Sequence, residues 1–233
     1  MTISSSADLW GCVKCGALFP ARVGFCHHCG GFETLVMQAP RPADSLWSAG
    51  GTDVVSARDL MRRRSTFITS SSYPTLKLGG QALVAVYGEP GSGKSTFLCK
   101  FLDGVSGNVL LLSVEEGVGD TLLGRLSRLE IHRADFFVGY ARTIDELEAV
   151  VSKSLPQAVA VDSLSASTLQ VGDLKRLAEQ YSIPVLFSLH VTKDGAAAGP
   201  MTALHESDVV VRVDALRWVV EKSRFSGIIN GEV

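Results

Sequence analysis

Residues 82–96 read Ala-Leu-Val-Ala-Val-Tyr-Gly-Glu-Pro-Gly-Ser-Gly-Lys-Ser-Thr, and this stretch predicts the architecture of the chain around it. An apolar run ending at Tyr87 passes directly into a segment with the spacing Gly-x-x-x-x-Gly-Lys-Ser. This order is typical of a buried strand, a phosphate-binding loop and a helix that begins near the lysine. A glycine-rich turn without a ligand is the alternative, and the complete motif in this context disfavours it.

The residue types in this loop suit a triphosphate and a metal ion. Glycines at 88, 91 and 93 allow a tight turn in which backbone N–H groups face an anion. Lys94 is expected to reach the β- and γ-phosphates, and the hydroxyl of Ser95 is expected to bind Mg²⁺. The predicted nucleotide-binding loop consists of Gly88, Glu89, Pro90, Gly91, Ser92, Gly93, Lys94, Ser95 and Thr96. The segment Thr192-Lys-Asp-Gly195 lacks the last acid of a guanine signature, so we expect ATP rather than GTP.

Apolar and amphipathic runs alternate after the loop. Strand-like runs are expected at 108–113, 135–138, 158–162 and 184–190, with helices at 120–130, 143–154 and 172–181 between them. This alternation predicts an α/β fold with a mainly parallel sheet flanked by helices. The runs 208–213 and 217–222 have no helix between them, so they predict a hairpin turning near Asp214-Ala215.

Acidic residues at strand ends are candidates for the metal and the attacking water. Asp162 ends the run 158–162 and would hold Mg²⁺ through water from a strand beside the phosphate loop. Glu115 and Glu116 follow the strand at 108–113, where a carboxylate can polarise a water molecule. A surface acidic pair is the alternative, and the register favours Glu115 as the functional residue.

Composition indicates a protein with a sizeable apolar core and no membrane segment. The chain has 233 residues, of which 46% are hydrophobic and 20% are charged. No secretory signal opens it and its apolar runs are short, so we expect a cytoplasmic protein. The net charge of −2 disfavours indiscriminate coating of nucleic acid.

The amino-terminal segment carries two Cys-x-x-Cys knuckles, formed by Cys12 with Cys15 and by Cys26 with Cys29. Their separation suits tetrahedral thiolate coordination of Zn²⁺, while iron is a weaker competitor and disulfide pairing suits a cytosolic chain poorly. We therefore expect a structural zinc ribbon over 1–36, a Pro- and Gly-containing linker over 37–53 and the ATPase domain over 54–233.

Four features of the sequence together resemble the RadA/Sms family of the RecA superfamily. They are the four-cysteine segment continuing to Thr34-Leu35, the phosphate loop, the run from His190 to Pro200, and Lys222-Ser-Arg224-Phe225. The resemblance implies a RecA-like ATPase core in an oligomeric, hexameric ring that acts on single-stranded or branched DNA in recombination and repair. The family continues into a carboxy-terminal Lon-protease-like domain, so we expect this sequence to be either a natural short form or a truncated part of a longer chain.

The resemblance extends to four further residues. It implies that Lys222 and Arg224 reach the γ-phosphate bound by the next subunit, and that His190 senses this phosphate while Lys193 contacts DNA. Independently of the family, phosphoryl transfer needs positive charge on the γ-phosphate, which an arginine can supply. The alternative for Arg224 is a surface residue paired with Glu221 or another acid.

The chain also departs from the family pattern. The family's Lys-Asn-Arg-Phe-Gly motif reads Lys222-Ser-Arg-Phe-Ser226 here, and the stretch from 163 to 172, where the family carries a first DNA-binding loop, is short. An alternative function is therefore a nucleotide-gated oligomeric regulatory or binding module with little activity on DNA.

Overall fold

The computed structural model describes residues 67–190, 201–225, 227 and 229–233, together with the backbone of three short strands at 9–12, 18–19 and 35–38. The chain divides into two compact units, residues 1–64 and 65–233. In the first unit β1 (Leu9–Cys12) pairs antiparallel with both β2 (Leu18–Phe19) and β3 (Leu35–Gln38).

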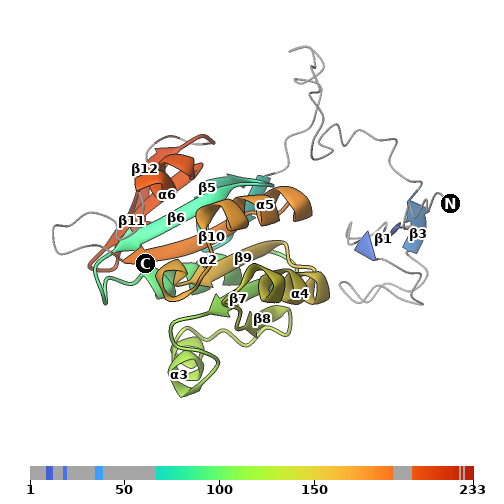
Figure 1. Cartoon of the computed structure of the whole chain (residues 1–233), viewed down its shortest axis with the longest axis horizontal. Helices are drawn as coiled ribbons and strands as arrows, with labels where there is room; N and C mark the ends of the chain where they lie inside the picture. Colours follow the sequence, from blue (N-terminus) through green and yellow to red (C-terminus); the bar gives the residue numbers. More distant parts are fainter. Residues whose placement is uncertain are drawn as a thin grey trace, which may run out of the picture. The chain divides into compact units, whose positions relative to one another are not determined.

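The second unit is built on a mainly parallel sheet, as the alternation of runs predicted (Figure 1). Its strands lie in the order β13-β12-β11-β6-β10-β9-β7-β8. Neighbours from β11 to β8 are parallel, whereas β12 and β13 run antiparallel. The strands are β6 (Leu83–Gly88), β7 (Val109–Ser113), β8 (Phe136–Gly139), β9 (Ala158–Asp162), β10 (Val185–His190), β11 (Val209–Asp214), β12 (Arg217–Ser223) and β13 (Asn230–Glu232).

Helices cover both faces of this sheet because the central strands are apolar on both sides. One core joins the sheet to α2 (Lys94–Asp103) and α3 (Asp120–Arg128). The other joins it to α4 (Ile144–Ser154), α5 (Val171–Tyr181) and α6 (Met201–Glu206). Strands β7 and β9 are buried along their whole length, which explains their uninterrupted apolar sequence.

The capping box expected at Thr143 is present at the start of α4. The Thr143 hydroxyl accepts a hydrogen bond from the Glu146 backbone N–H, and the Glu146 carboxylate accepts from the backbone N–H groups of Thr143 and Arg142. These backbone hydrogen bonds lower the pKa of Glu146.

The hairpin expected after residue 208 is present, but it turns one residue later than predicted. Strand β11 extends through Asp214, so the turn is formed by Ala215 and Leu216, both with positive φ. A turn with two left-handed residues usually contains Asn or Gly, and neither occurs here, so the sequence marked its position poorly. The turn lies against the phosphate loop, because the Leu216 N–H donates to the Ser92 carbonyl at 3.0 Å.

A second hairpin, β4 (Phe67–Ser70) with β5 (Tyr73–Gly79), was not predicted. Its Tyr73 ring stacks on Phe97 of α2 with the ring centroids 4.7 Å apart and meets Trp218 of β12 edge-on at 5.4 Å. This aromatic cluster attaches the hairpin to the helix that follows the phosphate loop.

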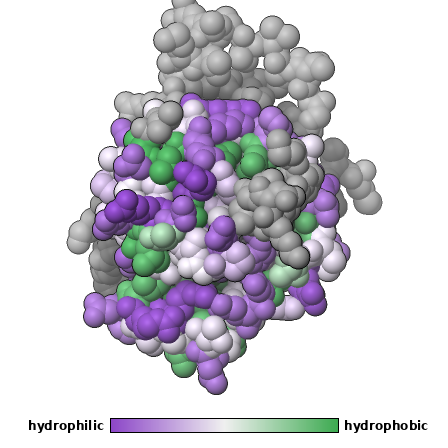
Figure 2. All heavy atoms as spheres, turned by 90° about the vertical axis from the view of Figure 1, so that its left-hand side faces the viewer, coloured by the Kyte–Doolittle hydropathy of each residue, from purple (hydrophilic) through white to green (hydrophobic). Residues whose placement is uncertain are grey.

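The α-helices in the described part of the chain are between 6 and 11 residues long. No helix there is long and apolar enough to cross a membrane. The face drawn in Figure 2 shows hydrophobic residues in small patches separated by hydrophilic ones.

Candidate nucleotide-binding site

The strand register brings several of the predicted site residues to one edge of the sheet. His190 at the end of β10 pairs with Gly88 at the end of β6, and Asp162 at the end of β9 pairs with Ser113 at the end of β7. Because these strands are parallel, their carboxyl ends meet where the phosphate loop begins, the usual ligand-binding edge of such a sheet. The structure corrects one neighbour relation: β10 separates the Asp162 strand from β6, so Asp162 does not lie on the strand next to the loop.

The backbone of the phosphate loop is shaped to surround an anion. Gly91 and Gly93 have φ of 77° and 108°, a region that L side chains rarely adopt. A Cβ on Gly88 would lie 2.0 Å from the Val213 carbonyl oxygen, so only glycine fits there. The buried Ser92 hydroxyl has no hydrogen-bond partner among the described residues. A buried hydroxyl without a protein partner in such a loop fits a hydrogen bond to a phosphate oxygen of a bound nucleotide.

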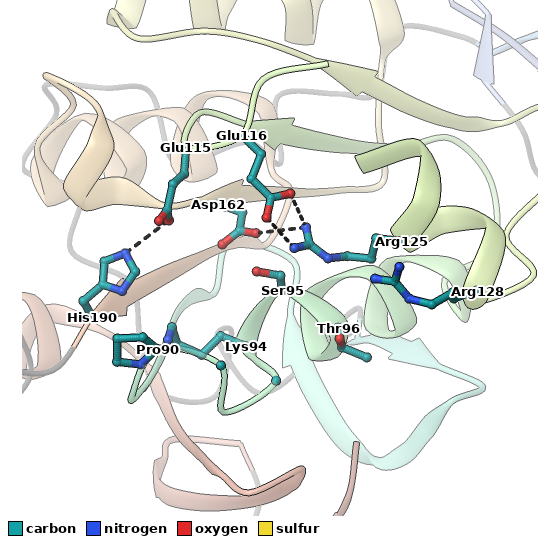
Figure 3. Close-up of a pocket in the computed structure, with 12 residues that line it drawn as sticks. Pro90, Lys94, Ser95, Thr96, Glu115, Glu116, Arg125, Arg128, Asp162 and His190 are labelled. Atoms are coloured by element: carbon teal, nitrogen blue, oxygen red, sulfur yellow. Dashed lines mark hydrogen bonds and ion pairs between the residues drawn. The ribbon is translucent and has the colours of Figure 1, made fainter. Parts of the chain in front are cut away.

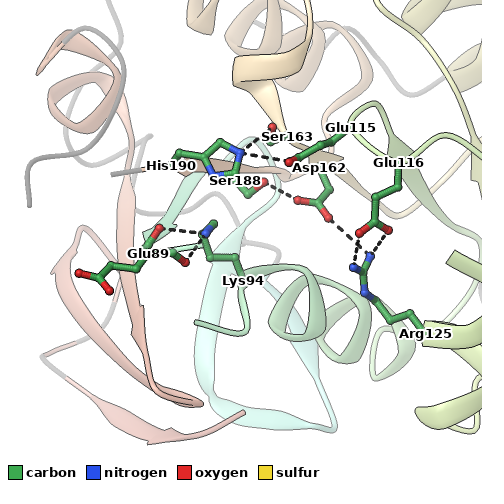
Figure 4. Close-up of polar contacts among 10 residues, drawn as sticks. Glu89, Lys94, Glu115, Glu116, Arg125, Asp162, Ser163, Ser188 and His190 are labelled. Carbon is green, nitrogen blue, oxygen red and sulfur yellow. Dashed lines mark hydrogen bonds and ion pairs between the residues drawn. The ribbon is translucent and has the colours of Figure 1, made fainter. Parts of the chain in front are cut away.

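Lys94 begins α2 and is held inside the loop. Its Nζ donates hydrogen bonds to the carbonyl oxygens of Gly88 at 2.9 Å and Glu89 at 2.8 Å (Figure 4). The residue is only 6% exposed, and this burial lowers the pKa of its amine, while the charges of Asp162 and Glu115 oppose the shift. The ammonium group is therefore placed in the loop before any nucleotide arrives.

The acidic residues form two separate polar pairs at the same edge. The Glu115 carboxylate lies 3.1 Å from His190 Nε2, which is also 3.5 Å from the Ser163 hydroxyl. The Asp162 carboxylate accepts a hydrogen bond of 2.6 Å from the buried Ser188 hydroxyl. Ser188 thus fixes the orientation of Asp162, and His190 fixes that of Glu115 (Figure 4).

Glu116 has a partner that the sequence did not suggest. Arg125 of α3 donates to both of its carboxylate oxygens, at 2.8 and 2.6 Å. Arg125 and Arg128 both line the site, and neither was among the predicted site residues. Their spacing of three residues on a helix directly after the acidic pair was the available signal, since it places both on one face.

These side chains enclose a cavity of about 370 Å³ above the phosphate loop (Figure 3). Its walls carry the lysine of the loop, three carboxylates and two arginines. They comprise Pro90, Gly91, Gly93, Lys94, Ser95, Thr96, Glu115, Glu116, Arg125, Arg128, Asp162 and His190. The Ser95 hydroxyl and the Asp162 carboxylate supply the hard oxygen ligands that Mg²⁺ prefers.

Lys222 and Arg224 do not reach this cavity within one chain. Strand β12 runs antiparallel to β11, and Ser223 pairs with Val209, whose other neighbour, Val84, lies near the start of β6. Both residues therefore lie at the sheet edge opposite the phosphate loop of the same chain.

At that opposite edge both cations have intramolecular partners. Lys222 Nζ donates to the Leu204 and His205 carbonyl oxygens at the end of α6. Arg224 Nη1 lies 3.0 Å from Asp208 Oδ1, yet the Arg224 side chain is 60% exposed. The acid that pairs with Arg224 is thus Asp208, because Glu221 contacts Arg212 and Tyr87 instead.

The remaining predicted site residues lie outside the described part of the chain. Lys193, Cys15, Cys26 and Cys29 are not described, and of Cys12 only the backbone is, at the end of β1. Among the described residues there is no group of three or more His, Cys, Asp or Glu side chains placed to hold a metal ion. The described free cysteine, Cys99, is buried in α2, and burial raises its thiol pKa to about 12.

The sheet order, the glycine loop with Lys94 and the carboxylates at the strand ends define a P-loop nucleotide-binding α/β protein. Comparison with known proteins narrows this class. The chain is 30% identical to DNA repair protein RadA of Bacillus subtilis over 88% of its own length and 51% of the relative's. It is 29% identical to the RadA proteins of Pseudomonas aeruginosa and Treponema pallidum, over 97% and 86% of its length.

No family model matches the chain. The chain spans about half the length of the curated relatives that it matches. The resemblance expected from the four sequence features is confirmed, and the chain is similar to RadA proteins over nearly all of its length.

Proposed function

We propose that this chain is a DNA-repair ATPase of the RadA type that hydrolyses ATP between subunits of an oligomeric ring. The observation that carries the proposal is the division of the catalytic charges between two opposite edges of one sheet. The loop lysine and the acids face the cavity at one edge, while Arg224 presents an exposed guanidinium at the other. A neighbouring copy of the chain can place the second edge over the first.

The described side chains suit separate steps of hydrolysis. Lys94 binds the terminal phosphates, and Ser95 with Asp162 would hold the Mg²⁺ that shields their charge when it is bound. Glu115 orients and polarises the attacking water, and its contact with His190 links that carboxylate to the end of β10. His190 lies three residues before Lys193 in the sequence. A rearrangement of His190 at the γ-phosphate would therefore be transmitted to the proposed DNA contact through a short stretch of backbone.

The regulatory-module alternative is favoured by one structural observation. Residues 163–170, which join β9 to α5, contain a short 3-10 turn (Leu164–Ala166). Leu164 and Leu169 in this connection are 7% and 4% exposed. A connection of this length that is anchored by two buried leucines leaves little chain to project toward single-stranded DNA.

ATP turnover measured with and without single-stranded DNA separates the two functions. We expect the DNA to stimulate turnover and the stimulation to fade between about 50 and 200 mM salt, because phosphate contacts release counterions. A poly-anion control such as heparin should not reproduce the effect. Turnover that is insensitive to DNA at every salt concentration would favour the regulatory module.

We further propose that the four cysteines 12, 15, 26 and 29 hold one structural Zn²⁺. A segment this short gains most of its stability from the metal, on the order of 10–16 kcal/mol for such sites. A strong chelator should release about one zinc ion per chain and unfold residues 10–36 first. Metal analysis together with hydrogen exchange checks both expectations, and purified protein without zinc would contradict them.

A further inference from the structure

Arg125 occupies an unusual place in the cavity. Its guanidinium, which projects from α3, forms a bidentate ion pair with Glu116. Its Nη1 also lies 4.0 Å from Asp162 Oδ2. Figure 3 shows the guanidinium reaching from α3 toward both carboxylates, with dashed lines to each. The cation therefore lies beside Asp162, one of the two residues that fit Mg²⁺.

The surroundings explain why a cation is needed there in the free protein. The side chains of Asp162 and Arg125 are only 10% and 15% exposed. A carboxylate removed from water is stable only when a positive charge or hydrogen bonds compensate for the lost hydration. Burial alone would lower the pKa of Arg125, but the hydrogen bond and charge of Glu116 and the charge of Asp162 raise it. The guanidinium consequently remains charged and compensates both acids.

We propose that Arg125 is a positioning residue that takes the place of the metal ion at Asp162 in the nucleotide-free protein, so that the guanidinium and nucleotide-bound Mg²⁺ compete for one carboxylate. This inference rests on the proposed nucleotide-binding function. Glu116 is also part of this arrangement, because it accepts two hydrogen bonds from Arg125. These hydrogen bonds would keep the guanidinium in the cavity when Mg²⁺ occupies its place at Asp162. The paired acids then have different tasks: Glu115 faces the reaction and Glu116 holds Arg125.

The competition has a consequence that binding measurements detect. Without Arg125 the cavity contains three carboxylates and one fewer cation, so metal-free nucleotide is repelled more strongly and Mg²⁺ is attracted more strongly. Arg125 thus makes binding less dependent on the metal. The diagnostic quantity is the ratio of the nucleotide Kd in excess EDTA to the Kd in excess Mg²⁺.

Calorimetric titration of the full chain with a non-hydrolysable ATP analogue measures this ratio. For Arg125→Gln we expect the ratio to rise about tenfold above that of the unmodified protein, which corresponds to about 1.4 kcal/mol. For Glu116→Gln we expect it to fall severalfold, because the freed guanidinium binds Asp162 more firmly. Arg176→Gln is the matched control, since Arg176 pairs with Asp173 on the exposed side of α5 and is not among the cavity-lining residues. Melting curves establish that each variant is folded.

The possible outcomes separate cleanly. An equal loss of affinity in both solutions for Arg125→Gln would make Arg125 a direct phosphate ligand and overturn the competition. An unchanged ratio in the two variants would reduce the ion pair to a structural contact and would also overturn it. If Arg125→Gln does not fold, an unchanged or increased ratio in Glu116→Gln decides against the proposal. Absence of binding by the unmodified protein would instead refute the nucleotide-binding function on which the proposal rests.

Discussion

Replacement of Lys94 by alanine is expected to lower ATP affinity and to reduce turnover by about 10²–10³-fold, the effect typical of one preorganised donor lost from an active site. The expected effect is large because Lys94 is the cation of the phosphate loop and is already held inside it by two carbonyl oxygens. Titration with labelled ATP and steady-state turnover measure the two losses separately.

Lys100→Ala is the matched control for this prediction. Lys100 lies on the same helix, α2, but in its last turn and outside the cavity. Lys94→Ala also leaves the Gly88 and Glu89 carbonyl oxygens without this donor, which costs about 1–3 kcal/mol of folding stability, so binding is compared well below the melting temperature. Full ATP affinity in folded Lys94→Ala protein would contradict the assignment of the loop.

The parts of this fold that sequence reasoning predicted are those with strong local signals. Strands β7 and β9 are uninterrupted apolar runs because helices cover both of their faces, and α4 begins at a complete capping box. The phosphate loop combines three glycines and a lysine at fixed spacing, and the described backbone adopts the strained angles that such glycines permit. Each of these features has a signal in consecutive residues of the sequence.

The parts that sequence reasoning missed depend on distant contacts. The β4–β5 hairpin is stabilised by Tyr73 against Phe97 and Trp218, residues far away in the chain. Arg125 reaches Glu116 and Asp162 only because α3 folds back over the edge where β7 and β9 end. The order of β6, β10 and β9 is likewise a property of chain crossovers, which hydrophobic periodicity does not encode.

Arg224→Ala is expected to reduce ATP turnover by about 10³-fold or more while ATP affinity changes less than about twofold, because an arginine finger acts mainly on the transition state. Arg224 lies at the edge opposite the phosphate loop of the same chain, so in the proposed ring it would act on a nucleotide held by a neighbouring subunit. Asp208→Asn is the matched control. It removes the charge that pairs with Arg224 but retains a side-chain oxygen for the Leu83 N–H.

If Arg224 served only the ion pair with Asp208, both substitutions would lower turnover equally, and the finger role would be lost. Mixing Arg224→Ala with Lys94→Ala protein gives a second, independent readout. An interface that takes its phosphate loop from the first variant and its arginine from the second has every charged group intact, so turnover should exceed that of either variant alone. A mixture no more active than its components, although the two variants assemble together, would show that hydrolysis is completed within one subunit and that Arg224 is a surface cation.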